Sequence, residues 1–238
     1  GDIEVIQTDA VSLEGREIIV RHAMPTGSAD TIVPRIAETS DMLRMFSDHF
    51  GAYPFESYGI AVIDSDLSGA PALENQTLSI FGSAMFTDYG DVFLRRTLAH
   101  ELAHQWFGNH VSPEQWSDIW LNEGFATWAE FWWAESVGID DIDRLAGEDL
   151  GPLLGLPAHQ LFDRRVYVRG ALTLEALRRE VGDDLFFEIL QLWVKRHGGE
   201  AAGTDDFLDL VADTADLDAS RLVEQWLTLP AMPDLPPE

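Results

Sequence analysis

The hydrophobic and polar positions divide the 238-residue chain into two parts of different periodicity. In the first part, the segments 16–23 (REIIVRHA), 58–65 (YGIAVIDS) and 76–82 (QTLSIFG) have the short, β-branched composition of strands. A loop rich in Gly, Pro and Ser, residues 66–75, separates the last two. Apolar residues at helical spacing in the segment 38–50 (ETSDMLRMFSDHF) predict one helix among these strands.

From about Phe86 onward, the apolar positions follow a helical period almost to the end of the chain. The pattern therefore predicts an α+β chain. A mixed β lobe, residues 1–85, precedes a helical lobe, residues 86–238, and no flexible linker separates them. Because clefts tend to form where such lobes meet, we expect the functional site near this boundary.

The chain is strongly acidic, with 42 Asp and Glu residues against 15 Lys and Arg residues and a net charge of −27. Such a field repels phosphate backbones and attracts amines and divalent metals, so we expect no nucleic-acid partner. A general role of the charge in solubility or salt adaptation is the alternative. The absence of cysteine excludes disulfides, cysteine-ligated zinc and thiol nucleophiles.

The sequence contains few signals that indicate the termini or the cellular compartment of the protein. No stretch has the length and apolarity of a membrane span, and residues 1–25 lack a signal-peptide pattern. We favour a soluble cytoplasmic protein over a secreted one. The chain opens on Gly1 rather than on methionine, which is consistent with a longer parent protein whose other domains are partners.

The segment 95–110 (RRTLAHELAHQWFGNH) carries three of the seven histidines. His100 and His104 lie four positions apart, so on a helix both imidazoles face one point, while Glu101 lies about 100° around the axis from His100. In this H-E-x-x-H pattern, the histidines bind zinc and the glutamate reaches a water without binding the metal. A helix that carries imidazoles for other reasons is the alternative. Gly108 and Asn109 are expected to end the helix.

A catalytic zinc requires a third protein ligand and an open fourth position. The next segment, 116–136 (WSDIWLNEGFATWAEFWWAES), reads as a helix that stops before Gly138 and supplies Glu123. A carboxylate among tryptophans and phenylalanines is costly unless it is paired or bound to metal. Glu123 is therefore the expected third ligand, and an exposed helix position is the alternative.

One acid and one amide on the same segment, Glu130 and Asn122, are candidates to orient the zinc ligands. Glu130 lies seven residues after Glu123 on the same helix face, where it can hold a histidine ligand in one tautomer. Asn122 can do similar work. A surface acid on an amphipathic helix is the alternative for Glu130. His110 is expected to be structural or exposed.

These residues carry a family resemblance. The segment 100–130 (HELAHQWFGNHVSPEQWSDIWLNEGFATWAE) resembles the zinc signature of the aminopeptidase N family of gluzincin peptidases, with eighteen residues (105–122) between the second histidine and the glutamate. Residues 71–76 (PALENQ) resemble the Gly-Ala-Met-Glu-Asn strand of that family, with Pro and Leu in place of Gly and Met. Residues 166–178 (VYVRGALTLEALR) resemble its catalytic-tyrosine segment, and 224–233 (EQWLTLPAMP) resemble the close of its catalytic domain.

The resemblance extends from about residue 18 to the end and implies a thermolysin-like, two-lobed catalytic domain. The N-terminal β domain and the C-terminal domains of the family have no counterpart here, and the first ~20 residues are expected to be a remnant of the upstream β domain. The interval between Glu123 and Tyr167 is shorter than the resemblance implies.

The resemblance also implies the roles of individual residues. One Zn²⁺ is bound by His100, His104 and Glu123, Glu101 acts as base and then as acid, and the Tyr167 hydroxyl helps to stabilise the oxyanion. Glu74 binds the free α-amino group of the substrate, and the backbone around Ala72 pairs with the peptide as an added strand edge.

The expected function is zinc-dependent hydrolysis of peptide bonds, with removal of N-terminal residues from peptide substrates. A thermolysin-style endopeptidase is the first alternative, since it shares the zinc chemistry but has no use for Glu74. A zinc-containing peptide-binding domain with little turnover in isolation is the second.

Overall fold

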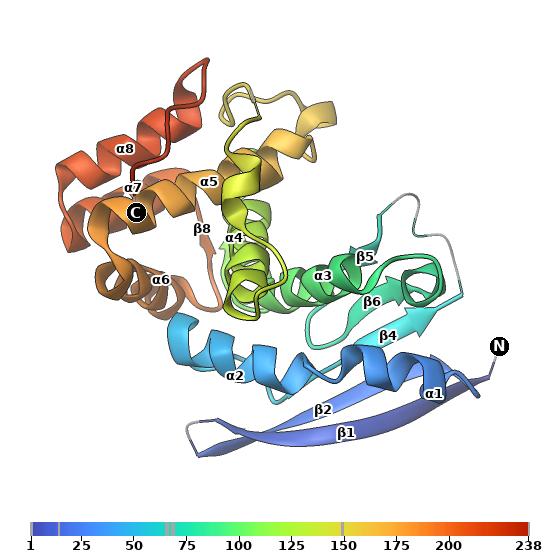
Figure 1. The fold of residues 1–238 in the computed structure, drawn as a ribbon. Helices are drawn as coiled ribbons and strands as arrows, with labels where there is room; N and C mark the ends of the chain where they lie inside the picture. The colour runs from blue at the N-terminus through green and yellow to red at the C-terminus, as the bar shows by residue number, and fades with distance from the viewer. Residues whose placement is uncertain (1, 14, 65–66, 68–69, 149, 238) are drawn as a thin grey trace.

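The protein is described here by a computed structural model, which covers residues 2–13, 15–64, 67, 70–148 and 150–237. Figure 1 shows α2 lying along the β1–β2 hairpin, with the longer helices beyond α2 on the same side of the sheet and α4 near the centre of the molecule. The strands precede Gly82 almost entirely, and helices predominate after it. The expected α+β class is confirmed.

The main sheet contains β1 (Ile3–Leu13), β2 (Arg16–Pro25), β3 (Ser57–Tyr58), β4 (Ile60–Ile63), β5 (Ala72–Leu73) and β6 (Ser79–Gly82). β1 and β2 form a long antiparallel hairpin, and β2, β4 and β6 run parallel. β5 is antiparallel to β6 and ends the strand order β1-β2-β4-β6-β5. Ile18, Val20 and Met24 of β2 are buried because alternate side chains of a strand point to the same face.

The predicted strands overlap β2, β3 with β4, and β6, although β2 continues to Pro25 and β3 begins at Ser57. The loop predicted over 66–75 is wrong at Ala72 and Leu73. These two residues form β5 by pairing with Phe81 and Ile80 of β6. A two-residue strand is too short to leave a period of two in the sequence, so only its partner strand reveals it. Residues 65–66 and 68–69 of the predicted segments lie outside the described residues.

The helices are α1 (Ala29–Ile32), α2 (Thr39–Phe50), α3 (Asp91–Ala103), α4 (Trp120–Ser136), α5 (Arg164–Val181), α6 (Asp183–His197), α7 (Thr204–Thr214) and α8 (Leu217–Thr228). Short 3₁₀ turns at 33–36, 83–86, 116–118, 142–145 and 158–160, with the paired strands β7 (Ser112–Pro113) and β8 (Ala201–Ala202), connect them. α2 matches the helix predicted over 38–50. None of the helices in the described part of the chain is long and apolar enough to cross a membrane.

α4 is buried on almost every side. Its aromatic residues Trp120, Phe125, Trp128, Phe131 and Trp133 are each at most 2% exposed and belong to the core, while Trp132 is partly buried. A helix that is apolar all round belongs in the interior of a domain. Any acid on α4 that points inward must therefore find its partners on neighbouring helices. Trp116 lies before α4 and is the exception, because it is 66% exposed.

α4 and α5 meet through two glycines. A Cβ atom added to Gly170 would lie 2.8 Å from the Cα of Gly124, which is closer than real Cβ contacts. The absence of both side chains lets the two helix backbones touch. Since Glu123 precedes one glycine and Tyr167 lies one turn before the other, this contact brings the N-terminal halves of α4 and α5 to the same place.

We expect Gly170→Ala to lower the free energy of unfolding by about 1–3 kcal/mol, because the added methyl group overpacks a backbone contact that cannot yield without separating the helices. Gly147→Ala is the matched control, since an added Cβ there meets nothing within 4 Å. Urea unfolding of both variants, followed by far-UV circular dichroism, measures the difference. Equal stability of the two variants would contradict this account of the α4–α5 contact.

Candidate metal centre

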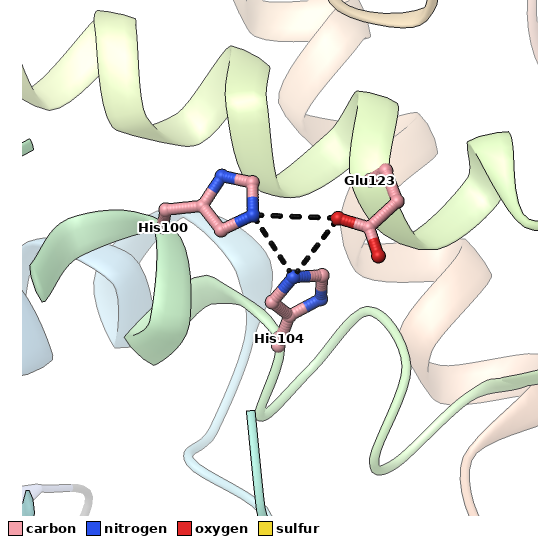
Figure 2. A group of neighbouring side chains, drawn as sticks. All are labelled: His100, His104 and Glu123. Carbon is pink, nitrogen blue, oxygen red and sulfur yellow. Dashed lines mark hydrogen bonds and ion pairs between the residues drawn. The ribbon is translucent and has the colours of Figure 1, made fainter. Parts of the chain in front are cut away.

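Three side-chain atoms from two helices converge on one point. The Nε2 atoms of His100 and His104 lie 3.1 Å apart, and the Glu123 Oε2 atom lies 3.4 Å from the first and 3.5 Å from the second. Figure 2 shows this triangle, with the histidines on α3 and its C-terminal end and the glutamate on α4. The three potential ligand atoms lie within 4.8 Å of one another, as the ligands of a single metal ion must.

The histidines owe their position to the end of α3. Leu94, Leu98 and Leu102 are buried and fix the rotation of the helix, so that the opposite face presents the imidazoles. The helix ends at Ala103, with His104 as its C-cap, so the end predicted at Gly108 and Asn109 is wrong. The chain turns earlier because the Asn109 N–H bonds back to the His104 carbonyl, at 2.9 Å.

Glu123 lies in the first turn of α4 and is 4% exposed. Burial alone would raise the pKa of its carboxyl group, but His104 and His100 outweigh burial and lower the pKa to about 2. With the two imidazoles protonated, the carboxylate is ionised and its charge is balanced, as expected of an acid among aromatic residues; a bound cation would replace those protons. The structure brings all three predicted ligands together.

Each imidazole is held by a bond to its other nitrogen. His100 Nδ1 lies 3.2 Å from Glu130 Oε2, and His104 Nδ1 lies 3.0 Å from the carbonyl oxygen of Phe107. When Nδ1–H donates to these acceptors, both Nε2 atoms are left as acceptors for a metal. The structure thus places Glu130 against a histidine ligand. The Phe107 carbonyl was missed, because a backbone group leaves no residue pattern.

Asn122 does not meet the expectation that it orients a ligand. Among the described residues, its side chain makes no hydrogen bond to either histidine, and its buried Oδ1 has no partner. It packs instead beside Gly108, whose φ is +129° and where a Cβ would lie 3.0 Å from Asn122 Nδ2. Asn122 therefore fills space next to His104 rather than fixing the imidazole.

Glu101 is buried beside this cluster, and its Oε2 has no hydrogen-bond partner among the described residues. Burial raises the pKa of Glu101 to about 7; His100 and His104 oppose this rise, whereas Glu74 and Glu123 add to it. A carboxylate with a pKa near neutrality can both accept and return a proton at neutral pH.

Tyr167 lies in the first turns of α5, and its ring stacks at 6.2 Å from the ring of His100 with an interplanar angle of 23°. Burial, followed by Glu123, Glu74 and Glu101, raises the pKa of its hydroxyl group, so the hydroxyl keeps its proton and can donate a hydrogen bond. Tyr167 follows Glu123 in the sequence at a shorter interval than the family resemblance implies, but its ring still lies beside His100.

One cavity of about 800 Å³ is lined by the three ligand candidates and by Glu101, Glu130 and Tyr167. One wall is the edge formed by Ala72, Leu73 and Glu74, the floor is the histidine and glutamate cluster, and the opposite wall comes from α4, α5 and the segment near Leu145. Ala72 and Glu74 thus share the cavity with the metal-ligand candidates. A cavity of this size accommodates a peptide end or another small ligand.

Two polar residues beyond α3 hold the strand edge against the cluster. Asn109 Nδ2 donates to the carbonyl of Glu74 at 2.6 Å. Gln105, which is fully buried, donates to the carbonyl of Asn75 at 3.3 Å and accepts from the N–H of Thr77 at 2.8 Å. Neither contact was predicted from the sequence, because neither residue has the spacing of a metal ligand.

The chain is similar to one protein family and to several curated proteins. The family described as Peptidase family M1 domain matches residues 35–145 and 157–226. Aminopeptidase N of Escherichia coli (strain K12) is 25% identical over 260 residues, which cover 98% of this chain and 29% of that protein. Endoplasmic reticulum aminopeptidase 1 of Homo sapiens is 30% identical over 206 residues, covering 76% of this chain and 22% of that protein.

Solved structures agree with the sequence comparison. The M1 zinc metallopeptidase from Deinococcus radiodurans has a TM-score of 0.86 and 37% identity, and the match covers 100% of this chain and 54% of that one. Aminopeptidase A of Legionella pneumophila, in complex with aspartic acid, shares the fold at a TM-score of 0.87 and 20% identity, over 97% of this chain and 28% of that one. The chain spans less than a third of the curated relatives given above. The matched family domain covers most of the chain and includes every residue of the triangle, so the chain belongs to peptidase family M1.

Proposed function

We propose that the chain is the catalytic part of a zinc aminopeptidase, which removes N-terminal residues from peptides. The observation that carries the proposal is the convergence of two imidazole nitrogens and one carboxylate oxygen in a cavity that Glu101, Tyr167 and Glu74 also line. The relatives named as aminopeptidases support the same activity.

The ligand set fits zinc. Zinc binds imidazole nitrogen and carboxylate oxygen at about 2.0–2.2 Å, and a tetrahedral site with such bonds has ligand atoms roughly 3.3–3.5 Å apart. The distances of 3.1, 3.4 and 3.5 Å among His100, His104 and Glu123 are close to that spacing. Three protein ligands also leave the fourth position that a catalytic site needs.

When bound, zinc would supply a Lewis acid that polarises the peptide carbonyl and acidifies water. The residues of the chain then have separate tasks. Glu101 accepts a proton from the attacking water and returns it to the departing amine. The Tyr167 hydroxyl donates a hydrogen bond to the carbonyl oxygen as negative charge develops on it. Glu130 keeps the His100 ring in place.

Glu74 favours removal of terminal residues over internal cleavage. Its carboxylate can bind the ammonium of a free N-terminus by charge-assisted hydrogen bonds. It directly follows β5, which ends the strand order of the described sheet and so offers a backbone edge to a peptide. An endopeptidase, whose substrate continues through this position, would instead place an uncharged peptide group beside a carboxylate.

We further propose that residues 1–85 and 86–238 act as the two lobes of this catalytic part, and that the parent protein contributes further domains. The small share of each relative that the chain covers supports the second point. A peptide-binding domain with little turnover alone is the remaining candidate, and it is favoured by the same partial coverage.

We expect Glu101→Gln to retain one zinc per chain and to lose about 10²–10⁴ in hydrolysis rate, because only proton transfer is removed. His104→Ala should lose tight zinc binding, because two ligands remain. Metal content after dialysis, measured by atomic emission, and hydrolysis of an amino-acyl fluorogenic amide test both. If Glu101→Gln released the metal while Glu123→Gln retained it, the ligand assignment would be wrong.

We expect Tyr167→Phe to lower kcat by about 10²–10³ with a much smaller change in KM, because the lost donor matters mainly once negative charge develops on the carbonyl oxygen. Steady-state kinetics at saturating zinc measure both constants. The phenyl ring preserves the stacking on His100, so the fold and the metal content serve as controls. An unchanged kcat would remove Tyr167 from the mechanism.

We expect Glu74→Ala to abolish selectively the hydrolysis of substrates with a free α-amino group. An amino-acyl fluorogenic amide is compared with its N-acetyl analogue for the wild type, Glu74→Ala and Glu74→Gln. The last variant keeps the shape but lacks the charge, and it should lose the preference too. Equal rates on both substrates in the wild type, unaffected by either change, would instead favour the endopeptidase.

A further inference from the structure

A chain of ion pairs lies behind the His100 imidazole, on the side away from the metal-ligand triangle. The Glu130 carboxylate uses its two oxygens differently: Oε2 faces His100 Nδ1 at 3.2 Å, and Oε1 lies 2.5 Å from Arg96 NH2. Arg96 NH1 in turn donates to Asp140 Oδ2 at 2.7 Å. Arg96 lies one turn before His100 on α3, so the same helix carries both the imidazole and the cation that binds its acceptor.

The Arg96 guanidinium is held from several sides. Its central carbon lies 3.9 Å from the ring centroid of Phe131 on α4, and the Asp140 oxygen that accepts from it also accepts from Arg144, at 2.6 Å. The side chains of Arg96, Glu130 and Asp140 are 16%, 13% and 10% exposed. Because little water reaches them, these pairs are screened far less than surface pairs.

The two histidines differ in what holds them. The acceptor for His104 is the backbone carbonyl of Phe107, which the turn after α3 already fixes. The acceptor for His100 is a glutamate side chain, which can rotate unless something holds its second oxygen. Arg96 is in contact with that oxygen. Carboxylates that orient a metal-binding histidine raise its strength as a ligand and fix its ring.

We propose that Arg96 is a positioning residue for the metal site. It fixes the Glu130 carboxylate against His100 Nδ1, and through it directs His100 Nε2 toward the ion, while Asp140 fixes Arg96. This inference rests on the proposed zinc function. Arg96 lines the same cavity, but its hydrogen bonds and ion pairs within the described part of the chain are to Glu130 and Asp140 and not to the three ligand side chains. In the proposed mechanism it does not contact the reacting atoms.

The competing explanation is that Arg96 has only a structural role, in which it links α3 to α4 and to the segment after α4. The adjacent residue offers a matched control, because Arg95 also forms a two-point bond to a carboxylate, donating to Glu38 at 2.7 Å from Nε and 2.6 Å from NH2. Its guanidinium also lies over an aromatic ring of α4, 5.3 Å from the centroid of Trp133. The pairing of Arg95 with Glu38 does not involve Glu130, so loss of Arg95 removes a contact between elements without disturbing the acceptor of His100.

The experiment measures the zinc dissociation constant by competition with a chromogenic chelator, for the wild type and for R96M, R95M, E130Q and the R96M/E130Q double variant. We expect R96M to weaken zinc binding by about 10-fold or more, and R95M to leave it unchanged. The double variant should bind zinc no more weakly than E130Q alone, because Arg96 acts through Glu130 and the two effects are therefore not additive.

A spectroscopic readout and a milder variant complete the test. In the cobalt-substituted protein, R96M should shift the visible absorption bands, which report ligand geometry, and R95M should not. Thermal unfolding of the metal-free variants reports the fold. If R96M does not fold, D140N retains the arginine but removes the carboxylate charge that fixes it, and should weaken zinc binding in the same direction. Equal loss in R95M and R96M, additive losses in the double variant, or zinc affinity unchanged in both R96M and D140N would overturn the inference. A wild type that binds no zinc would overturn the proposed function instead.

Discussion

The burial of the Glu123 carboxylate is the constraint on which the helical part of the protein depends. The acid lies in α4, a helix rich in aromatic residues that is buried on almost every side. An uncompensated negative charge in this position would be strongly destabilising. α3 meets this requirement by presenting His100 and His104 at the same depth. The packing of α3 against α4 therefore also brings the metal-ligand set together.

The contact between α4 and α5 adds the remaining side of the cavity. Gly124 and Gly170 let the helix backbones approach, which brings Tyr167 over the ring of His100. On the opposite side, Asn109 and Gln105 bind the backbone after β5, so the strand edge is tied to the end of the helix that carries the imidazoles. α4, α5 and the strand edge after β5 are thus all positioned relative to α3. These contacts define the shape of the cavity, although its walls come from distant parts of the sequence.

Much of this arrangement could be predicted from the sequence, because helix geometry alone makes residues four apart face one point. The same holds for the placement of an acid among aromatic residues on a second helix. What sequence reasoning could not supply were contacts set by tertiary structure. The Phe107 carbonyl has no side-chain signature, β5 exists only through its pairing with β6, and the contact between Arg96 and Asp140 joins residues 44 positions apart. The packing of Asn122 beside Gly108 is likewise set by tertiary structure, and its neighbours in the sequence do not indicate it.

The unlike supports of the two imidazoles have a consequence for how such a site can change over evolutionary time. A backbone acceptor does not depend on the side chain of its residue, so the support of His104 does not depend on which residue occupies position 107. His100 is instead supported by the side chains of Glu130 and Arg96, and each of these residues can be replaced by substitution. Natural variation or laboratory selection can therefore tune how firmly the ion is held from one side only, while the ligands and the other imidazole stay as they are.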